Sequence, residues 1–304
     1  MVRLPPQVHV FVRDWLSSNN IVLKSNAGDV VIDSGYHVHA QHTLQLLRTR
    51  WGLGERPLSR LVNTHCHSDH IGGNAAIAAA YGCPISIPAG EAHLIDPWNP
   101  DGLWLDYADQ FAPQFMYDAL IETGDVNVWG DLEWQALAAP GHDMGALMFY
   151  NAAHRLLITG DALWEDGFGF VLPAEMDSRC IPAARATLDL IEALGAEVVI
   201  PGHGEPFTDV RGAVMRARSR LAALEQDPAR NARHILKVML VFSLLSGRRI
   251  RALDLADYCR SVPVFRDFND RFLRQDVAEL ATLLVSELER AGAIRRDGEW
   301  LVPG

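Results

Sequence analysis

The chain has 304 residues, of which 49% are hydrophobic and 21% charged, and its formal net charge is −11. A chain of this length and composition can bury a sizeable core, and the lack of long single-sign charge runs excludes a mainly disordered protein. The acidity excludes a general affinity for nucleic-acid phosphates unless a local basic patch overrides the average.

The N-terminus and the apolar runs of the chain lead us to expect a cytoplasmic protein. The opening sequence MVRLPPQVHVFVRDW has neither an apolar signal core nor a small-residue cleavage site. No apolar run reaches membrane-spanning length, so we expect no membrane partner. The four cysteines lack paired spacing and are expected to be small buried hydrophobes: Cys66, Cys83, Cys180 and Cys259.

The elements predicted before residue 90 are, in order, a hairpin at 21–32, a helix within 37–50, a strand at 61–62 and a helix at 72–80. The hairpin is predicted from the turn sequence Asn26-Ala27-Gly28 between two apolar runs. Leu44 and Leu47 lie at helical spacing and predict the first helix. The short strand leads directly into the sequence THCHSDH.

Residues 91–123 break this regular pattern. The segment is rich in aromatic residues, including Trp104 and Tyr107, and contains three prolines. An insertion of this composition is either a lid over a substrate or a contact between two copies of the chain in a homodimer. Packing of single aromatic side chains back onto the core is the structural alternative.

Strands and helices alternate after residue 132. Strands are predicted at 132–138, 147–150, 156–159 and 198–200, with a helix at 182–194. Strands first, followed by alternating strands and helices, predict an α+β fold in which two sheets are sandwiched by helices.

The chain after residue 208 is predicted to be mostly helical. An amphipathic helix at 277–291 is followed by two short apolar runs around Asp297-Gly298, which is the outline of a winged-helix module. Residues 1–225 carry 14 Lys and Arg against 27 Asp and Glu, whereas residues 226–304 carry 13 against 11. We therefore expect a larger domain at 1–225 and a small, mainly helical domain at 226–304.

Three histidines and an aspartate lie within six residues, in His65-x-His67-x-Asp69-His70. His65 and His67 are two apart at a strand end, so both side chains point to one side. The chain then turns, which brings Asp69 and His70 back toward the same point. Neutral imidazole and carboxylate are ligands that zinc prefers, and the motif therefore predicts a metal site.

Three later motifs place an acid or an imidazole in a glycine-containing loop after a strand. They are Pro140-Gly141-His142, Gly160-Asp161 and Pro201-Gly202-His203-Gly204. Glycine permits a tight turn and a close approach of the backbone to a site. The other histidines lack this setting and are interpreted as ordinary surface or core residues: His9, His37, His39, His42, His93, His154 and His234.

The motifs THCHSDH, PGH, GD and PGHG, in this order, resemble the metallo-β-lactamase superfamily over roughly residues 8–207. The resemblance implies an αββα sandwich of two mixed sheets flanked by helices. It also implies ligand roles. The first metal is held by His65, His67 and His142, the second by Asp69, His70 and His203, and Asp161 bridges both.

The resemblance implies two divalent metals as cofactors, with zinc preferred and iron or manganese as alternatives. A bridging aspartate resembles the glyoxalase II, lactonase and ribonuclease branches. Asp33-Ser34-Gly35 resembles the early aspartate turn of the family, which supports the ligands from behind. A purely structural turn is the alternative interpretation. Cys66 lies between two ligands in an extended stretch, so its side chain is expected to point away from the metals.

A paired metal site favours hydrolysis. Two divalent ions about 3.5–4 Å apart share a water and lower its pKa, and the resulting hydroxide attacks a carbonyl or phosphoryl centre. The surplus positive charge stabilises the oxyanion that forms. Asp69 is the predicted catalytic residue, because its carboxylate can orient the hydroxide and receive its proton.

The first functional hypothesis is a hydrolase of a small thioester, ester or lactone. The acidic larger domain and the aromatic segment favour it, because an apolar acyl group needs such a pocket. Residues 162–167 are acidic and the chain has only two lysines, which disfavours the glutathione specificity of glyoxalase II. Lactonases of the superfamily place a tyrosine where Trp164 lies, and Trp164, Trp104 and Tyr107 are the predicted substrate contacts.

The alternative hypothesis is an endoribonuclease or phosphodiesterase of the same superfamily. A winged-helix-like module occurs in one nuclease-containing branch, and five arginines of the tail suit phosphates: Arg248, Arg249, Arg251, Arg295 and Arg296. The net charge disfavours a nucleic-acid partner, and a solvated surface is the preferred interpretation of these arginines. A third hypothesis, a non-enzymatic metal-binding protein, is disfavoured by the complete ligand set.

Overall fold

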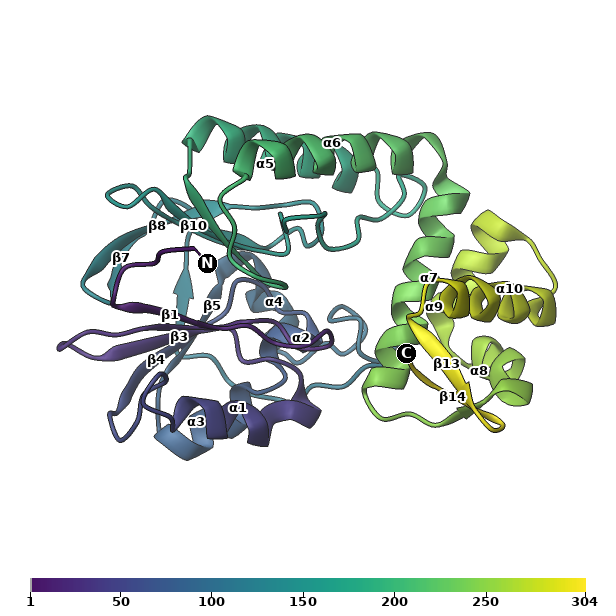
Figure 1. The fold of residues 1–304 in the computed structure, drawn as a ribbon, viewed down its shortest axis with the longest axis horizontal. Coiled ribbons are helices and arrows are strands. Elements are labelled where there is room, and N and C mark those ends of the chain that lie inside the picture. Colours follow the sequence, from purple (N-terminus) through teal and green to yellow (C-terminus); the bar gives the residue numbers. More distant parts are fainter. Residues whose placement is uncertain (1) are drawn as a thin grey trace.

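The computed structural model describes residues 2–304. Its larger part consists of two β-sheets packed face to face between two layers of helices, and a smaller helical part lies beside it (Figure 1). This arrangement confirms the predicted αββα sandwich. None of the helices within residues 2–304 is both long enough and apolar enough to cross a membrane.

The first sheet has six strands that are neighbours in chain order. β1 to β3 pair antiparallel, and β3 to β6 pair parallel. The predicted hairpin is β2–β3, in which Ile21 pairs with Ile32. The strands are β1 (Val8–Phe11), β2 (Asn20–Leu23), β3 (Asp29–Ile32), β4 (Leu58–Val62), β5 (Ile85–Pro88) and β6 (Ala119–Ile121).

The second sheet has five strands in the order β11-β10-β9-β8-β7. Only the β10–β11 pair is parallel, so this sheet is mixed as well. Its strands are β7 (Val126–Trp129), β8 (Leu132–Ala138), β9 (Leu147–Asn151), β10 (Leu156–Gly160) and β11 (Val198–Pro201).

Alternating side chains explain the layers. On β3, Val30 and Ile32 are buried between the sheets, while Val31 packs in the cluster that contains α1 (Ala40–Leu47) and α3 (Asn74–Tyr81). On β10, Leu157 likewise points outward, into the cluster that contains α5 (Cys180–Leu194) and α6 (Val210–Gln226). Because both faces of each sheet are apolar, each sheet needs a cover on both sides.

The segment 91–123 has little regular structure beyond α4 (Ala92–Ile95) and β6. Leu103, Leu105 and Phe115 are buried against the first sheet's helical side. Ala108 is instead buried in the core of the C-terminal part. The segment therefore connects the two apolar cores, because its short apolar runs alternate between them.

The C-terminal part has its own apolar core, built around α7. Its helices are α7 (Pro228–Leu245), α8 (Leu255–Ser261), α9 (Pro263–Phe268) and α10 (Val277–Arg290), with a π-helical turn at Asn269–Leu273. The predicted terminal hairpin is β13 (Ile294–Asp297) with β14 (Trp300–Pro303). A third strand, β12 (Ile250–Arg251), pairs with β14 and is too short to show a sequence period.

All four cysteines are free and buried, as the sequence predicts. Cys66 lies in the apolar cluster on the helical side of the first sheet, so its side chain points away from its histidine neighbours. Burial raises the pKa of its thiol well above the ordinary value, which leaves it protonated near pH 7.

Candidate metal centre

Each predicted ligand lies close after a strand of the sandwich. His65 and His67 lie between β4 and the short helix α2 (Ser68–Ile71), which itself carries Asp69 and His70. His142, Asp161 and His203 follow β8, β10 and β11. The first four ligands therefore come from the six-stranded sheet and the last three from the five-stranded sheet, and the packing of the sheets brings them together.

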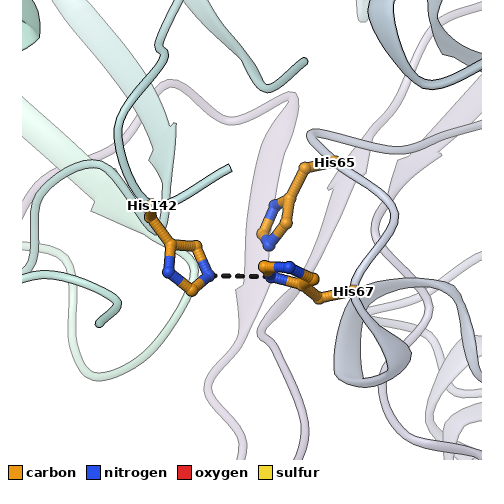
Figure 2. A group of neighbouring side chains, drawn as sticks. All are labelled: His65, His67 and His142. Atoms are coloured by element: carbon orange, nitrogen blue, oxygen red, sulfur yellow. Dashed lines mark hydrogen bonds between the residues drawn. The ribbon is translucent and has the colours of Figure 1, made fainter. Parts of the chain in front are cut away.

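His65, His67 and His142 form one group, in which one nitrogen of each ring lies within 4.8 Å of the others. Figure 2 shows the three rings pointing toward one another. Nδ1 of His67 lies 2.8 Å from Nε2 of His142. Nδ1 of His142 donates to the carbonyl oxygen of Phe170 at 2.6 Å, which directs Nε2 of His142 toward the group.

Asp69, His70, Asp161 and His203 form a second, fully buried group. Nε2 of His203 lies 3.0 Å from Oδ2 of Asp69. Asp161 lies between the two groups. Its Oδ1 is 3.3 Å from Nε2 of His70 and its Oδ2 is 3.5 Å from Nε2 of His142. One carboxylate oxygen thus faces each group, which is the placement that a bridging ligand needs.

Asp33 holds the second group from behind. Its Oδ2 accepts a hydrogen bond from Nδ1 of His70 at 2.8 Å, which directs Nε2 of His70 toward the site. The same carboxylate accepts hydrogen bonds from the backbone N–H and the hydroxyl of Thr64, both at 2.9 Å. The aspartate turn noted in the sequence is therefore in direct contact with a predicted ligand.

Two glycines allow the ligand loops to approach one another. A Cβ at Gly202 would lie 2.3 Å from Oδ1 of Asp161. Gly160 has a φ of +51°, and a Cβ there would lie 2.9 Å from Oγ1 of Thr64. Any larger side chain at these positions would push the strand ends apart, which is why glycine occurs in both motifs.

The protonation states suit metal ligands. Burial lowers the pKa of His65 and lowers that of His67 to about 4, so both rings are neutral near pH 7. Burial opposes ionisation of Asp161, but the surrounding histidines hold its pKa well below the ordinary value. The pKa of Asp69 is lowered in the same way. Neutral imidazoles and ionised carboxylates are the forms that bind metals.

The raised pKa of His70 shows that the carboxylates of the second group favour a positive charge at this position. Burial alone would lower its pKa, but the carboxylates of Asp33, Asp161 and Asp69 together raise it well above the ordinary value. A divalent cation bound between the carboxylates supplies the same positive charge without a proton on the imidazole.

The unpaired nitrogens of the site fit metal ions. Nε2 of His65, Nε2 of His70 and Nδ1 of His203 are buried without a hydrogen-bond partner within residues 2–304. A buried polar atom left unpaired costs about 1–3 kcal/mol. Coordination by the two Nε2 atoms would remove that cost in both groups, and the combined nitrogen and oxygen donors suit zinc, iron or manganese.

The sequence profile of the Metallo-beta-lactamase superfamily matches residues 13–203 of this chain. The chain belongs to this superfamily. All seven predicted ligands of this superfamily member lie within the matched residues.

Two relatives are similar over most of the length of this chain. A hydroxyacylglutathione hydrolase of Rhodospirillum rubrum is 29% identical over 228 residues, which cover 71% of this chain and 73% of the relative. An acyl-coenzyme A thioesterase, MBLAC2, of Gallus gallus is 26% identical over 208 residues, which cover 62% of this chain and 73% of the relative.

Solved structures show the same fold. A metallo-beta-lactamase family protein from Thermus thermophilus aligns with a TM-score of 0.58 at 20% identity, covering 99% of this chain and 100% of its own. A structure of another protein in a di-iron-bound form aligns with a TM-score of 0.53 at 23% identity, covering 68% of this chain and 98% of its own. The di-zinc class B3 metallo-beta-lactamase LRA-12 from an Alaskan soil metagenome aligns with a TM-score of 0.56 at 17% identity, covering 73% of this chain and 93% of its own.

A cavity of about 210 Å³ opens beside the candidate metal centre of this superfamily member. Its lining includes five of the predicted ligands: His67, Asp69, His142, Asp161 and His203. The remaining walls are mostly aromatic or aliphatic and come from several parts of the chain: Trp15, Trp104, Trp164, Phe168, Phe170, Val238, Met239 and Phe242. An apolar group of small size fits such a cavity.

Of the three predicted substrate contacts, two line this cavity and one lies elsewhere. Trp104 and Trp164 both line the cavity, and the indole N–H of Trp164 donates to Oδ1 of Asp161 at 3.3 Å. Tyr107 is not among the described residues that line it. Its hydroxyl donates to Oδ2 of Asp267 at 3.2 Å and its ring packs against the C-terminal core.

Several cavity residues carry no signal in the sequence. Trp15 lies 5.2 Å from the ring of His203, and Phe170 lies 4.9 Å from that of His142, both measured between ring centroids. His234, interpreted from the sequence as an ordinary residue, lines the cavity together with Arg220. These residues lie outside the ligand motifs, and only the packing of α6 and α7 brings the last two to the cavity.

Proposed function

We propose that this chain is a dinuclear metal-dependent hydrolase that cleaves the carbonyl of a small substrate, with a thioester as the preferred class and an ester or lactone as close alternatives. The observation that carries the proposal is the convergence of both ligand groups, with Asp161 between them, beside an apolar cavity of about 210 Å³. The names of the two relatives, both thioester hydrolases, support the thioester.

The first metal would be held by His65, His67 and His142, and the second by Asp69, His70 and His203, with Asp161 shared. Zinc is the preferred metal, and iron or manganese are the alternatives. Two divalent ions, when bound, lower the pKa of a shared water and stabilise negative charge on an attacked carbonyl oxygen.

The chain's own residues orient the reactants. Oδ2 of Asp69 contacts His203, which leaves Oδ1 to hold the attacking water and take its proton. Trp164 holds Asp161 in place through its indole N–H. The aromatic walls, including Phe170, exclude bulk water and hold the acyl group against the site.

Contacts of the tail arginines support a small substrate over RNA. Arg248 pairs with Asp109, Arg251 with Asp254 and Arg296 with Glu289. Arg249 lies over the ring of Trp300 at 4.5 Å. Four of the five tail arginines thus already have partners within the chain, which weakens their attraction for a phosphate backbone.

The decisive experiment compares initial rates of one zinc-reconstituted preparation on acyl thioesters, aryl esters, lactones and a single-stranded RNA. We expect cleavage of a carbonyl substrate, fastest for thioesters. His142→Ala should abolish turnover and lower the bound metal while leaving the circular dichroism spectrum unchanged, because it removes one ligand of three in the first group.

His154→Ala is the matched control, because His154 is exposed and lies outside both groups. It should retain full activity and full metal content. Unchanged activity in His142→Ala would refute the ligand assignment, and cleavage of RNA alone would refute the carbonyl substrate.

A further inference from the structure

A second cavity, of about 750 Å³, lies along α6 and α7 and shares Arg220 and His234 with the apolar cavity. Its described lining contains five Arg and Lys residues and no carboxylate: Arg216, Arg220, Arg230, Arg233 and Lys237. A concentration of positive charge next to the metal site is unexpected in a chain whose net charge is −11.

Only part of this charge is neutralised inside the protein. Three carboxylates pair with three of the five cations: Arg216 pairs with Asp166 and Asp209, and Arg233 and Lys237 share Glu287. Within residues 2–304, no carboxylate lies within 4.0 Å of the guanidinium group of Arg220 or Arg230, although Asp227 accepts a hydrogen bond from the backbone N–H of Arg230. The cavity therefore keeps a formal surplus of two positive charges.

Arg220 stands at the junction of the two cavities. Its guanidinium lies 5.4 Å from the ring centroid of Phe168, a wall residue of the apolar cavity. It donates a hydrogen bond to Nε2 of His234 at 2.8 Å. Burial, followed by the nearby cations Arg220, Lys237 and Arg230, lowers the pKa of His234 to about 4. His234 is thus a neutral acceptor near pH 7, and Arg220 keeps its charge available for an anion.

We propose that this basic cavity, on the surface of α6 and α7, binds a phosphate-bearing group on the thiol side of the substrate while the thioester carbonyl lies at the metal centre. Several guanidinium forks in one cavity suit phosphate, since each can bind two of its oxygens. The volumes agree with this division, because the smaller cavity accepts an acyl group and the larger one has room for a nucleotide.

The inference rests on the proposed thioester hydrolysis. In that reaction the water oxygen forms a bond to the carbonyl carbon, the C–S bond breaks, and the thiol leaves with a proton. The phosphate group takes no part in these bond changes. Its role is to bind the leaving portion, so its contacts should affect KM far more than kcat.

The first test measures binding without chemistry. Adenosine 3′,5′-bisphosphate is titrated into the zinc-reconstituted full-length protein by calorimetry, because this probe has phosphates but no thiol to bind the metals. We expect binding that weakens with added salt. Arg220→Gln and Arg230→Gln should each raise the Kd roughly tenfold or more, since each removes a charge-assisted hydrogen bond.

Arg218→Gln is the matched control. Arg218 lies on the same helix and carries the same charge, but it pairs with Asp189 and Glu192 and is not among the described cavity residues. It should leave the Kd unchanged. Arg230 is exposed, so its variant is expected to fold even if the half-buried Arg220 proves necessary for stability. Equal Kd values for wild type, Arg230→Gln and Arg218→Gln would overturn the proposal.

The second test separates this inference from the proposed function. Hydrolysis of acetyl-coenzyme A is compared with that of S-acetyl-N-acetylcysteamine, which has a thioester but no phosphate. We expect Arg230→Gln to raise KM for the phosphorylated substrate only. Hydrolysis of both with equal KM, and no bisphosphate binding, would overturn the phosphate site alone. Failure to hydrolyse any thioester would overturn the proposed function, and RNA cleavage lost in Arg230→Gln would assign the cavity to RNA instead.

Discussion

At the scale of single residues, the candidate site depends on side chains that never touch a metal. Asp33 is the clearest case, because its carboxylate accepts hydrogen bonds from Nδ1 of His70 and from Thr64 at the same time. It thereby fixes the orientation of one predicted ligand and the position of the loop that leads to His65. Its φ of +59° places it in a left-handed turn between β3 and the ligand loops.

We predict that Asp33→Asn lowers the affinity for zinc about 10- to 100-fold, as loss of such supporting carboxylates generally does. The amide keeps the size of the side chain but removes the charge that favours His70 as a ligand. Competition with a coloured chelator measures the zinc Kd. Asp101→Asn, at an exposed position, is the control and should not change it. A wild-type Kd in Asp33→Asn would show that the contact is purely structural.

At the scale of elements, particular residues at the ends of strands and at the starts of helices determine the local structure. Gly202 lets the loop after β11 approach Asp161, Gly160 lets the end of β10 approach Thr64, and an aspartate precedes each of α6, α7 and α10. Asp276 precedes α10, and its carboxylate accepts hydrogen bonds from the backbone N–H groups of Ala278 at 2.8 Å and Glu279 at 3.3 Å. This helix fills the core of the C-terminal part through Leu280 and Leu284.

Asp276→Ala should therefore lower the free energy of unfolding by about 1 kcal/mol, because two N–H groups at the helix start lose their acceptor. Urea denaturation followed by circular dichroism measures the change. Asp276→Asn should be close to wild type, since asparagine caps a helix about as well as aspartate. Equal loss in both variants would mean that charge, rather than the hydrogen bonds, stabilises the helix start.

At the scale of the whole molecule, the two predicted metals join the sheets. The loop that carries His65, His67, Asp69 and His70 follows a strand of the six-stranded sheet, whereas His142, Asp161 and His203 follow strands of the other sheet. Metal binding would therefore stabilise the packing of the sandwich as well as supply the reaction.

We predict that zinc raises the melting temperature of the metal-free protein by several degrees. Free zinc at 100 times its Kd contributes about 2.7 kcal/mol to the folded state, because the unfolded chain does not hold the ligands together. Thermal unfolding with increasing zinc measures the shift, and His142→Ala should show a smaller one. No shift at saturating zinc would contradict a site preformed across the two sheets.

The sequence by itself determined the sandwich, the candidate ligands and part of the strands, whereas β1, β5, β6, β7 and β12 were not predicted because they are short and carry no clear period. Strand periodicity and turn residues are local, so β2–β3, β8 to β10 and the terminal hairpin could be predicted from a few neighbouring positions. The ligands could be predicted because motif and metal chemistry act over short spacings, as in the run from His65 to His70. The resemblance to one superfamily then supplied their pairing across the chain.

Only the tertiary structure decided what surrounds the ligands. Trp15, Phe170 and the residues of α7 meet at one cavity although 227 positions separate Trp15 from Phe242. The direction of Tyr107 depends on Asp267 and on the C-terminal core, and the basic cavity depends on the packing of α6 against α7. Such contacts arise when apolar faces that are distant in the sequence pack together, and a local sequence pattern does not indicate which faces will be in contact.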